Sequence, residues 1–196
     1  MVERIKVNFR KVQHGLWLII EKLLRWCVHP WLRARALNVL GARIAAHVRI
    51  DEIMLVNPVL GFKNLSIDHD SYIGTGTIID LIGKVEIGSH TSISPGCMLM
   101  THSDPGSQFG SGLCSVFPRR VSTISIGSHV WVGAGTIILA GVTIGDYVVI
   151  GAGSLVNRSL PDHVLAYGQP ARVVKRLPEL AVPTDKYCEK KADSEL

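Results

Sequence analysis

A six-residue period over residues 126–161 limits the possible folds of this chain more than any other feature. Each block of six in this stretch begins with an aliphatic side chain: Ile126, Val132, Ile138, Ile144, Ile150 and Val156. A helix repeats every 3.6 residues or so and a strand every two, so neither produces this pattern. A hexapeptide period is typical of a parallel β-helix, in which three blocks close one triangular coil. We therefore expect Ile126 to stack on Ile144, and Val132 on Ile150.

The same period extends toward the N-terminus with two interruptions. It is visible from Ile44 onward and is regular over Ile67, Ile73 and Ile79. Two additional residues within 81–84 then delay the next aliphatic position to Ile87, which predicts a bulge at a corner of the coil. Residues 103–122 are rich in Gly, Ser and Pro and break the period, so they predict a long loop between coils. A loop of this length in a compact repeat is usually functional.

Composition restricts the class of protein. The chain has 196 residues, enough for one domain, and combines 47% hydrophobic with only 6% aromatic residues, which fits a narrow Ile/Val core. Its four cysteines lack close spacing and indicate neither disulfides nor a zinc site, so we expect a reducing, cytoplasmic location. We expect no signal peptide and no transmembrane helix. A net charge of +5 is too small to predict nucleic-acid binding.

Residues 1–43 differ from the rest of the chain. They contain nine Lys/Arg against two acidic residues, and three of the four tryptophans. Leu16, Ile19 and Leu23 belong to an apolar stripe at helical spacing, which Pro30 should interrupt and Gly41 should end. Two interpretations stay open: a basic amphipathic helix on an anionic membrane surface, or a helix packed on the β-helix or on a neighbouring subunit.

These patterns divide the chain into three parts. Residues 1–43 form a basic amphipathic helical segment, and residues 44–176 form the β-helix domain with its inserted loop 103–122. Residues 177–196 are a polar C-terminal tail, which we expect to be frayed. The expected fold class is all-β with an N-terminal helical segment.

Three motifs together resemble one known family. They are Thr101-His102 before the long loop, the segment IGSHVWVGAGTIILAGVTIGDYVVIGAGSLV, and AYGQPARVVKR near the end. Over residues 41–176 they resemble the hexapeptide-repeat acyltransferases, the superfamily of galactoside and maltose acetyltransferases, and within it the enzymes that O-acetylate exopolysaccharide sugars. The resemblance implies a left-handed parallel β-helix, acetyl-CoA as acyl donor, no metal, and a homotrimer with active sites between subunits.

His102 is the expected catalytic base. Acyl transfer to a hydroxyl requires a group that accepts the hydroxyl proton, and neutral imidazole does this near pH 7. His102 stands at the junction of coil and loop, where the resemblance places the base. His90 and His129 occupy equivalent positions in two IGSH blocks, so we interpret them as surface or interface residues.

The resemblance also implies contacts with coenzyme A along the coil edges. The small residues Ala134 and Ala152 lie eighteen positions apart, one full coil, and leave the backbone accessible to the pantetheine amides. Arg158 is one of the basic groups that suit phosphate, although a solvated basic end is the alternative. Trp131 lies beside the cleft or at a subunit interface. The expected set is Trp131, Ala134, Ala152, Asn157, Arg158, Arg172 and Lys175.

The acceptor side matches the sugar acetyltransferases poorly. They place an Asn in the coil below the catalytic histidine, where we expect Gly74 here, and acidic residues near the corner bulge, where the nearest is Asp80. Asp68 and Asp70 are further candidates, and Arg119 with Arg120 could contact an anionic or lipid-linked sugar. The acceptor hydroxyl is therefore left open.

We predict an O-acetyltransferase that moves an acetyl group from acetyl-CoA to a hydroxyl of a sugar or polysaccharide precursor. The alternative is a metal-dependent, carbonic-anhydrase-like β-helix protein or a non-catalytic one. The absence of a His-x4-His pair argues against the metal-dependent alternative.

Overall fold

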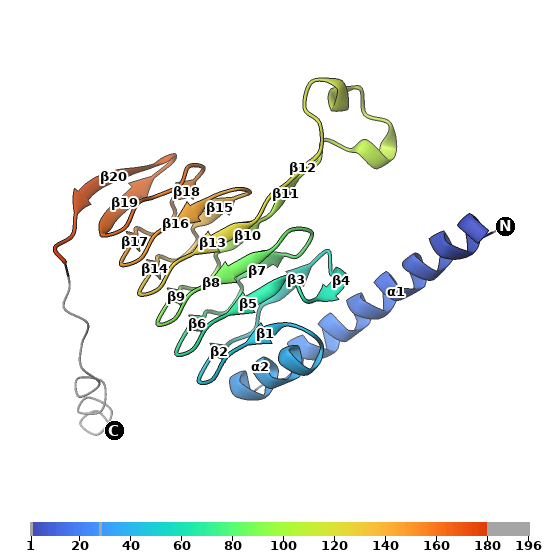
Figure 1. The fold of residues 1–196 in the computed structure, drawn as a ribbon, viewed down its shortest axis with the longest axis horizontal. Coiled ribbons are helices and arrows are strands. Elements are labelled where there is room, and N and C mark those ends of the chain that lie inside the picture. Colours follow the sequence, from blue (N-terminus) through green and yellow to red (C-terminus); the bar gives the residue numbers. More distant parts are fainter. Residues whose placement is uncertain (1, 28, 180–196) are drawn as a thin grey trace.

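The computed structural model describes residues 2–27 and 29–179, and most of this part is a parallel β-helix with three sheets (Figure 1). The first sheet stacks β1 (Arg43–Ile44), β5 (Leu65–Ile67), β8 (Val85–Ile87), β13 (Ile124–Ile126) and β16 (Thr143–Ile144). The second stacks β2 (Arg49–Ile50), β6 (Tyr72–Ile73), β9 (Ser92–Ile93), β14 (Trp131–Val132), β17 (Val149–Ile150), β19 (Val164–Gly168) and β20 (Ala171–Arg176). The third stacks β3 (Met54–Val56), β7 (Ile78–Asp80), β10 (Met98–Met100), β15 (Ile137–Leu139) and β18 (Leu155–Val156).

The chain visits the three sheets in turn, and each set of three strands is one coil. The coils are β1–β3, β5–β7, β8–β10, β13–β15 and β16–β18, numbered here from first to fifth. Two expected registers are confirmed, since Ile126 pairs with Ile144 and Val132 with Ile150. Parallel pairing between coils satisfies the backbone polar groups, so a narrow apolar column suffices as a core. Ile150 and Val132 are buried in that column.

The two interruptions of the period lie where the sequence predicts them. Ile67 pairs with Ile87, twenty residues further on, because residues 81–84 form a longer connection between β7 and β8. The loop leaves the third coil on a short antiparallel stalk of β11 (His102–Ser103) and β12 (Arg120–Val121). Beyond the stalk it contains two 3-10 turns, η1 (Ser107–Phe109) and η2 (Gly112–Ser115), and it projects from the β-helix (Figure 1).

Two helices lie at the N-terminal end, α1 (Val2–Arg25) and α2 (Pro30–Val39). Trp17 of α1 packs edge-on against Phe62 of β4 (Val59–Phe62), with ring centroids 5.3 Å apart. Glu21, also in α1, is buried and accepts a hydrogen bond from the backbone N–H of Leu55 at 3.2 Å. Buried Arg33 of α2 donates to a backbone carbonyl of β2 at 2.8 Å. One face of each helix therefore closes the first coil.

The remainder of α1 extends beyond the β-helix (Figure 1). Within the described residues, no helix is both long and apolar enough to cross a membrane. Of the predicted polar tail, residues 180–196 lie outside the described part of the chain.

Candidate functional site

His102 stands where the third sheet turns toward the first, at the base of the projecting loop. It is the first residue of β11 and pairs with Val121 on the returning strand. The preceding residue, Thr101, is completely buried, so the chain is anchored immediately before the histidine. The backbone N–H of Ser122 donates to the Thr101 carbonyl at 2.9 Å and closes the stalk on its other side. The position of the imidazole is thus set by the coil and not by the loop.

The imidazole of His102 is held by a buried carboxylate. Its Nδ1 lies 2.5 Å from Oδ2 of Asp80, the last residue of β7 in the coil below. The Asp80 side chain is fully buried, whereas that of His102 is 19% exposed. The pair therefore has one end in the protein interior and the other at the surface.

Asp80 is held by several donors. Thr101 donates to Oδ2 from its backbone N–H at 3.1 Å and from its hydroxyl at 2.6 Å, and the amide of Asn57 donates to Oδ1 at 2.9 Å. Burial alone would raise the pKa of Asp80, but the hydrogen bonds from Thr101, Asn57 and His102 outweigh burial, and the net pKa lies below its ordinary value. Asp80 is therefore an ionised carboxylate at neutral pH.

This arrangement determines the tautomer of His102. An ionised carboxylate only accepts hydrogen bonds, so Nδ1 of His102 carries the proton that faces Asp80. The other ring nitrogen, Nε2, then has a lone pair and is able to accept a proton. The geometry is that of a general base held by a buried acid.

The base of the loop is stabilised by Asp104. Its carboxylate accepts hydrogen bonds from the backbone N–H groups of Gly106 at 2.9 Å and Ser107 at 2.6 Å, and Arg119 lies 3.6 Å from it. Hydrogen bonds from the Ser107 hydroxyl and backbone lower the pKa of Asp104. A pocket of about 580 Å³ opens beside this loop, between Ser103 and Phe117.

The expected coenzyme A residues fall into two groups. Trp131 lies on the second sheet, and Ala134 and Ala152 lie at the corner where the second sheet meets the third. Ala134 and Ala152 are exposed and adjacent, since the carbonyl of Ala134 accepts a bond from the N–H of Gly153 at 2.8 Å. The Trp131 side chain is 56% exposed, and its indole N–H donates to Ser94 at 3.2 Å. It projects outward, as the sequence predicts.

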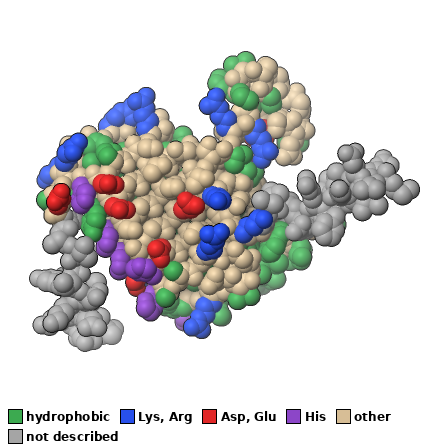
Figure 2. Space-filling model, in the orientation of Figure 1, with side chains coloured by type: hydrophobic (Ala, Val, Ile, Leu, Met, Phe, Trp, Pro, Cys, Tyr) green, Lys and Arg blue, Asp and Glu red, His purple; other side chains and the backbone are tan. Residues whose placement is uncertain are grey.

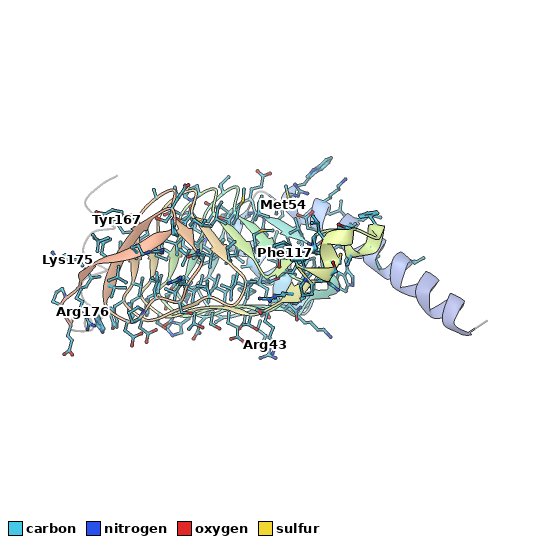
Figure 3. The ribbon with its side chains drawn as sticks, turned by 90° about the horizontal axis from the view of Figure 1, so that it is seen from above. Arg43, Met54, Phe117, Tyr167, Lys175 and Arg176 are labelled. Atoms are coloured by element: carbon cyan, nitrogen blue, oxygen red, sulfur yellow. The ribbon has the colours of Figure 1, made fainter. Side chains whose placement is uncertain are left out.

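The basic residues are also divided between locations. Asn157 and Arg158 follow β18 and lie on the same corner as His102, two coils further along. Arg172 and Lys175 are exposed on β20, the outermost strand of the second sheet. Lys175 lies at one end of the molecule, well away from Phe117 of the loop (Figure 3). The third sheet separates His102 from Trp131 and the two alanines within one chain.

The expected position of Gly74 was wrong. Ile73 pairs with Ile93 on the second sheet, so Gly74 lies at the next corner, against Pro95, and not in the coil below His102. Asp80, by contrast, contacts His102 directly. The alternative acids are also distant from the histidine in the fold, because Asp68 and Asp70 lie between β5 and β6, on another corner.

Two residues of the site were not identified from the sequence. Thr101 belongs to a motif but has no predicted role of its own, and the period does not single out Asn57. Asn57 precedes a proline and has a left-handed φ of 56°, so an Asn-Pro turn was a detectable signal. Asp80 is a candidate from the sequence, but its contact with Asn57 is not predictable, because the first coil is irregular in length and hides which residues stack.

A family model and several relatives match the chain. The model described as bacterial transferase hexapeptide (six repeats) matches residues 123–158. A galactoside O-acetyltransferase of Lactococcus lactis is 37% identical over 85% of this chain and 79% of its own length. A putative colanic acid biosynthesis acetyltransferase of Escherichia coli is 30% identical over 81% and 84%. Nodulation protein L of Rhizobium meliloti is 46% identical over 56% of this chain, which spans 58% of that protein.

Solved structures match the same fold. A hexapeptide-repeat acetyltransferase of Vibrio cholerae has a TM-score of 0.74 at 20% identity, covering 87% of this chain and 93% of its own. A galactoside acetyltransferase in complex with coenzyme A has a TM-score of 0.66 at 26% identity, covering 84% and 82%. The expected left-handed parallel β-helix is confirmed. With the relatives of comparable length, these matches show that the chain belongs to the hexapeptide-repeat acetyltransferase family.

Proposed function

We propose that this protein is an O-acetyltransferase that transfers the acetyl group of acetyl-CoA to a hydroxyl of a sugar or polysaccharide precursor. The observation that carries the proposal is the 2.5 Å contact between Nδ1 of His102 and the buried carboxylate of Asp80. This contact leaves Nε2 of a partly exposed imidazole ready to accept a proton. The named relatives with sugar-directed activities support the acceptor class.

The reaction follows from this geometry. Nε2 of His102 takes the proton of the acceptor hydroxyl while the hydroxyl oxygen attacks the thioester carbonyl carbon. Negative charge develops on the carbonyl oxygen, where a backbone N–H would stabilise it. The tetrahedral intermediate then collapses and breaks the carbon–sulfur bond. The thiolate of coenzyme A takes the proton from the His102 imidazolium, which restores the neutral base.

Coenzyme A would occupy the edges of the coils. Ala134 and Ala152 offer a narrow strip of small, exposed residues for the pantetheine arm. Arg172 and Lys175 lie at the C-terminal end of the coils, where guanidinium and ammonium groups would meet the nucleotide phosphates. The related galactoside acetyltransferase solved with coenzyme A supports this ligand.

A homotrimer would complete the site. In one chain, the third sheet separates His102 from Ala134, so neither group alone forms a full site. If the corner of one β-helix faces the second sheet of its neighbour, His102 of one subunit meets the coenzyme A strip of the next. A closed ring with threefold symmetry would repeat this contact three times.

The loop beside His102 restricts the class of acceptor. Arg120 lines the pocket beside Ser103, next to His102, so an anionic sugar is the acceptor we favour. Arg119 is engaged by Asp104 and would contribute less. Gly74 and Asp80, both expected as acceptor residues, have different roles here: Gly74 lies at another corner, and Asp80 is buried behind the histidine.

We also propose a cytoplasmic location with peripheral membrane contact through residues 1–43. A row of apolar side chains along α1 and the turn that follows it is spaced four, three, four and three residues apart and is 55–84% exposed: Val12, Leu16, Ile19, Leu23 and Trp26. The excess of basic over acidic residues in this segment, nine against two, would repel a second copy and complement anionic lipid. Sedimentation with anionic and neutral vesicles tests this, with Ile19→Glu/Leu23→Glu as the variant and Val39→Glu as its exposed control. The wild type and Val39→Glu should sediment with anionic vesicles, and the double variant should not. A protein that forms a larger oligomer and does not bind vesicles would contradict the membrane proposal.

The enzymatic proposal is tested with acetyl-CoA and a panel of neutral and anionic sugars. Release of free thiol that depends on both an acceptor and His102 is the expected result. Thermal stabilisation by coenzyme A provides a separate measure, since a ligand at a hundred times its dissociation constant adds roughly 2.7 kcal/mol. A folded protein that neither binds coenzyme A nor releases thiol would instead support the non-catalytic alternative.

A further inference from the structure

One corner of the β-helix, where the first sheet turns toward the second, carries a column of aromatic rings. Neighbouring rings are stacked with centroids 4.6–4.8 Å apart, in the order His90, His129, Tyr147 and His163. His69 meets His90 edge-on at 5.1 Å. Histidines gather along one edge of the molecule in Figure 2. His102 stands on a different corner, so this column belongs to no part of the proposed active site.

The backbone of the corner explains why these side chains align. His47, Asp70 and His90 each have a left-handed φ, between 53° and 57°, a region in which Asn, Asp and His are enriched. Hydrogen bonds between coils fix their heights, with the N–H of Asp70 donating to the Ala46 carbonyl at 3.2 Å and that of His90 to the His69 carbonyl at 3.0 Å. Because coils are stacked about 4.8 Å apart, side chains of successive coils reach one another.

At the N-terminal end of the column, a carboxylate joins the imidazoles. Oδ2 of Asp70 lies 2.8 Å from Nδ1 of His69, and Oδ1 lies 3.2 Å from Nδ1 of His47. One ligand atom from each of His69, Asp70 and His90 lies within 4.8 Å of the other two. Ligand atoms around a tetrahedral zinc ion lie roughly 3.3 Å apart, because each bond is about 2.0 Å long.

We propose that His69, Asp70 and His90 form a surface site for a divalent transition metal such as Zn²⁺, with His47 as the fourth ligand. Imidazole nitrogens and a carboxylate oxygen are ligands that zinc prefers. When the metal binds Nδ1 of His69, the proton that Nδ1 shared with Asp70 moves to solvent or to Nε2. All four side chains are exposed, so an ion enters from solvent without rearrangement of the core.

Carboxylates further along the same corner have other partners. Oδ1 of Asp146 accepts the backbone N–H of Ser128 at 2.7 Å, and Oδ1 of Asp162 accepts the N–H of Asp146 at 2.8 Å. Asp70 is different because its carboxylate contacts imidazoles of its own coil and of the coil below. The proposed ligand set is therefore specific to the first three coils.

Such a site would join the coils where the β-helix is least regular. His47 comes from the first coil, His69 and Asp70 from the second, and His90 from the third. A metal held by all three coils would stabilise the folded state, because the unfolded chain does not hold these ligands together. The site has no part in acyl transfer and does not rest on the proposed function.

The test uses the full-length protein, with any purification tag removed and stripped of metal by a chelator. Co²⁺ is titrated and followed by its visible absorption, and Zn²⁺ competition and calorimetry give stoichiometry and affinity. Asp70→Asn and His90→Asn are suitable variants, since Asn tolerates the left-handed φ at both positions. His163→Asn is the matched control, at an equivalent corner position with φ 54°.

One Zn²⁺ per chain and an intense tetrahedral Co²⁺ spectrum are expected. Each ligand variant should weaken Zn²⁺ binding at least tenfold and abolish the metal-induced rise in melting temperature, while His163→Asn changes neither. Equal binding by the variants and the control would overturn the proposal, as would no saturable binding by the wild type. Circular dichroism confirms that each variant is folded.

Discussion

Nδ1 of His102 lies 2.5 Å from Oδ2 of Asp80, although the two residues come from different coils. The side chain of His102 is partly exposed, whereas that of Asp80 is fully buried. This contact connects the interior of the β-helix with its surface. His102 stands at the base of a projecting loop, and Asp80 at the end of β7 holds its imidazole from the coil.

His102→Asn should abolish most of the acetyltransferase activity. Loss of a general base costs on the order of 10²–10⁴ in rate. Coenzyme A binding should be unchanged, because the imidazole contacts the acceptor hydroxyl and not the nucleotide. Steady-state thiol release gives the rate, and the coenzyme A-dependent shift in melting temperature gives binding. Full activity in a folded variant would exclude His102 as the base.

Asp80→Asn should also reduce the turnover number, although Asp80 does not touch substrate. An amide at this position has one oxygen where the carboxylate has two, and its NH2 would face the donors of Thr101 or Asn57. The loss of a buried hydrogen-bonded acceptor should destabilise the fold by about 1–3 kcal/mol. The kinetic constants distinguish positioning from folding: the turnover number should fall while the KM for the acceptor changes little, because His102 loses the carboxylate that holds its imidazole in place. An unchanged turnover number with reduced stability would indicate a purely structural role.

Much of this fold follows from local repetition, and much of the site does not. The pairs Ile126–Ile144 and Val132–Ile150 were predictable because neighbouring coils of equal length stack at a constant offset. The contact of Asp80 with His102 was not, since the additional residues at 81–84 disturb the count at that corner. For the same reason, counting along the period puts Gly74 in the coil below His102, whereas Gly74 follows β6 of the second sheet. The chemistry of acyl transfer points to His102 as the base, whereas its contact with Asp80 is visible only in the folded chain.

Part of the loss of unfolding free energy at low pH should depend on Asp80. Its pKa in the folded state lies below the ordinary value of 3.8, so the unfolded chain takes up a proton first as the pH falls. The stabilising contribution is therefore complete well above pH 3.8 and is lost as the pH falls through that value toward the folded pKa. Urea unfolding of the wild type and Asp80→Asn between neutral pH and pH 3 measures this. The difference in unfolding free energy should narrow with acid, and a constant difference would contradict the assignment.

Gly61→Ala should loosen the docking of α1. Gly61 has a φ of +72°, and a Cβ there would lie 2.8 Å from the Trp17 ring. Both the backbone strain and the clash oppose the substitution, so a loss of about 1–3 kcal/mol is expected. Gly15→Ala is the matched control: nothing lies within 4 Å of its Cβ, and alanine favours a helix interior by about 0.5–1 kcal/mol. Thermal unfolding should therefore move in opposite directions for the two variants.

A site shared between subunits predicts complementation between two inactive variants. His102→Asn removes the base, and Ala152→Trp fills the exposed strip proposed for coenzyme A. In a mixed trimer, one of the three interfaces combines an intact His102 with an intact Ala152. Equal, random mixing of unfolded chains followed by refolding makes three quarters of the trimers mixed, so about a quarter of wild-type activity should return. Each variant refolded alone should stay inactive. If the mixture is as inactive as its components while its trimers form, both residues act within one subunit and the intersubunit site is wrong.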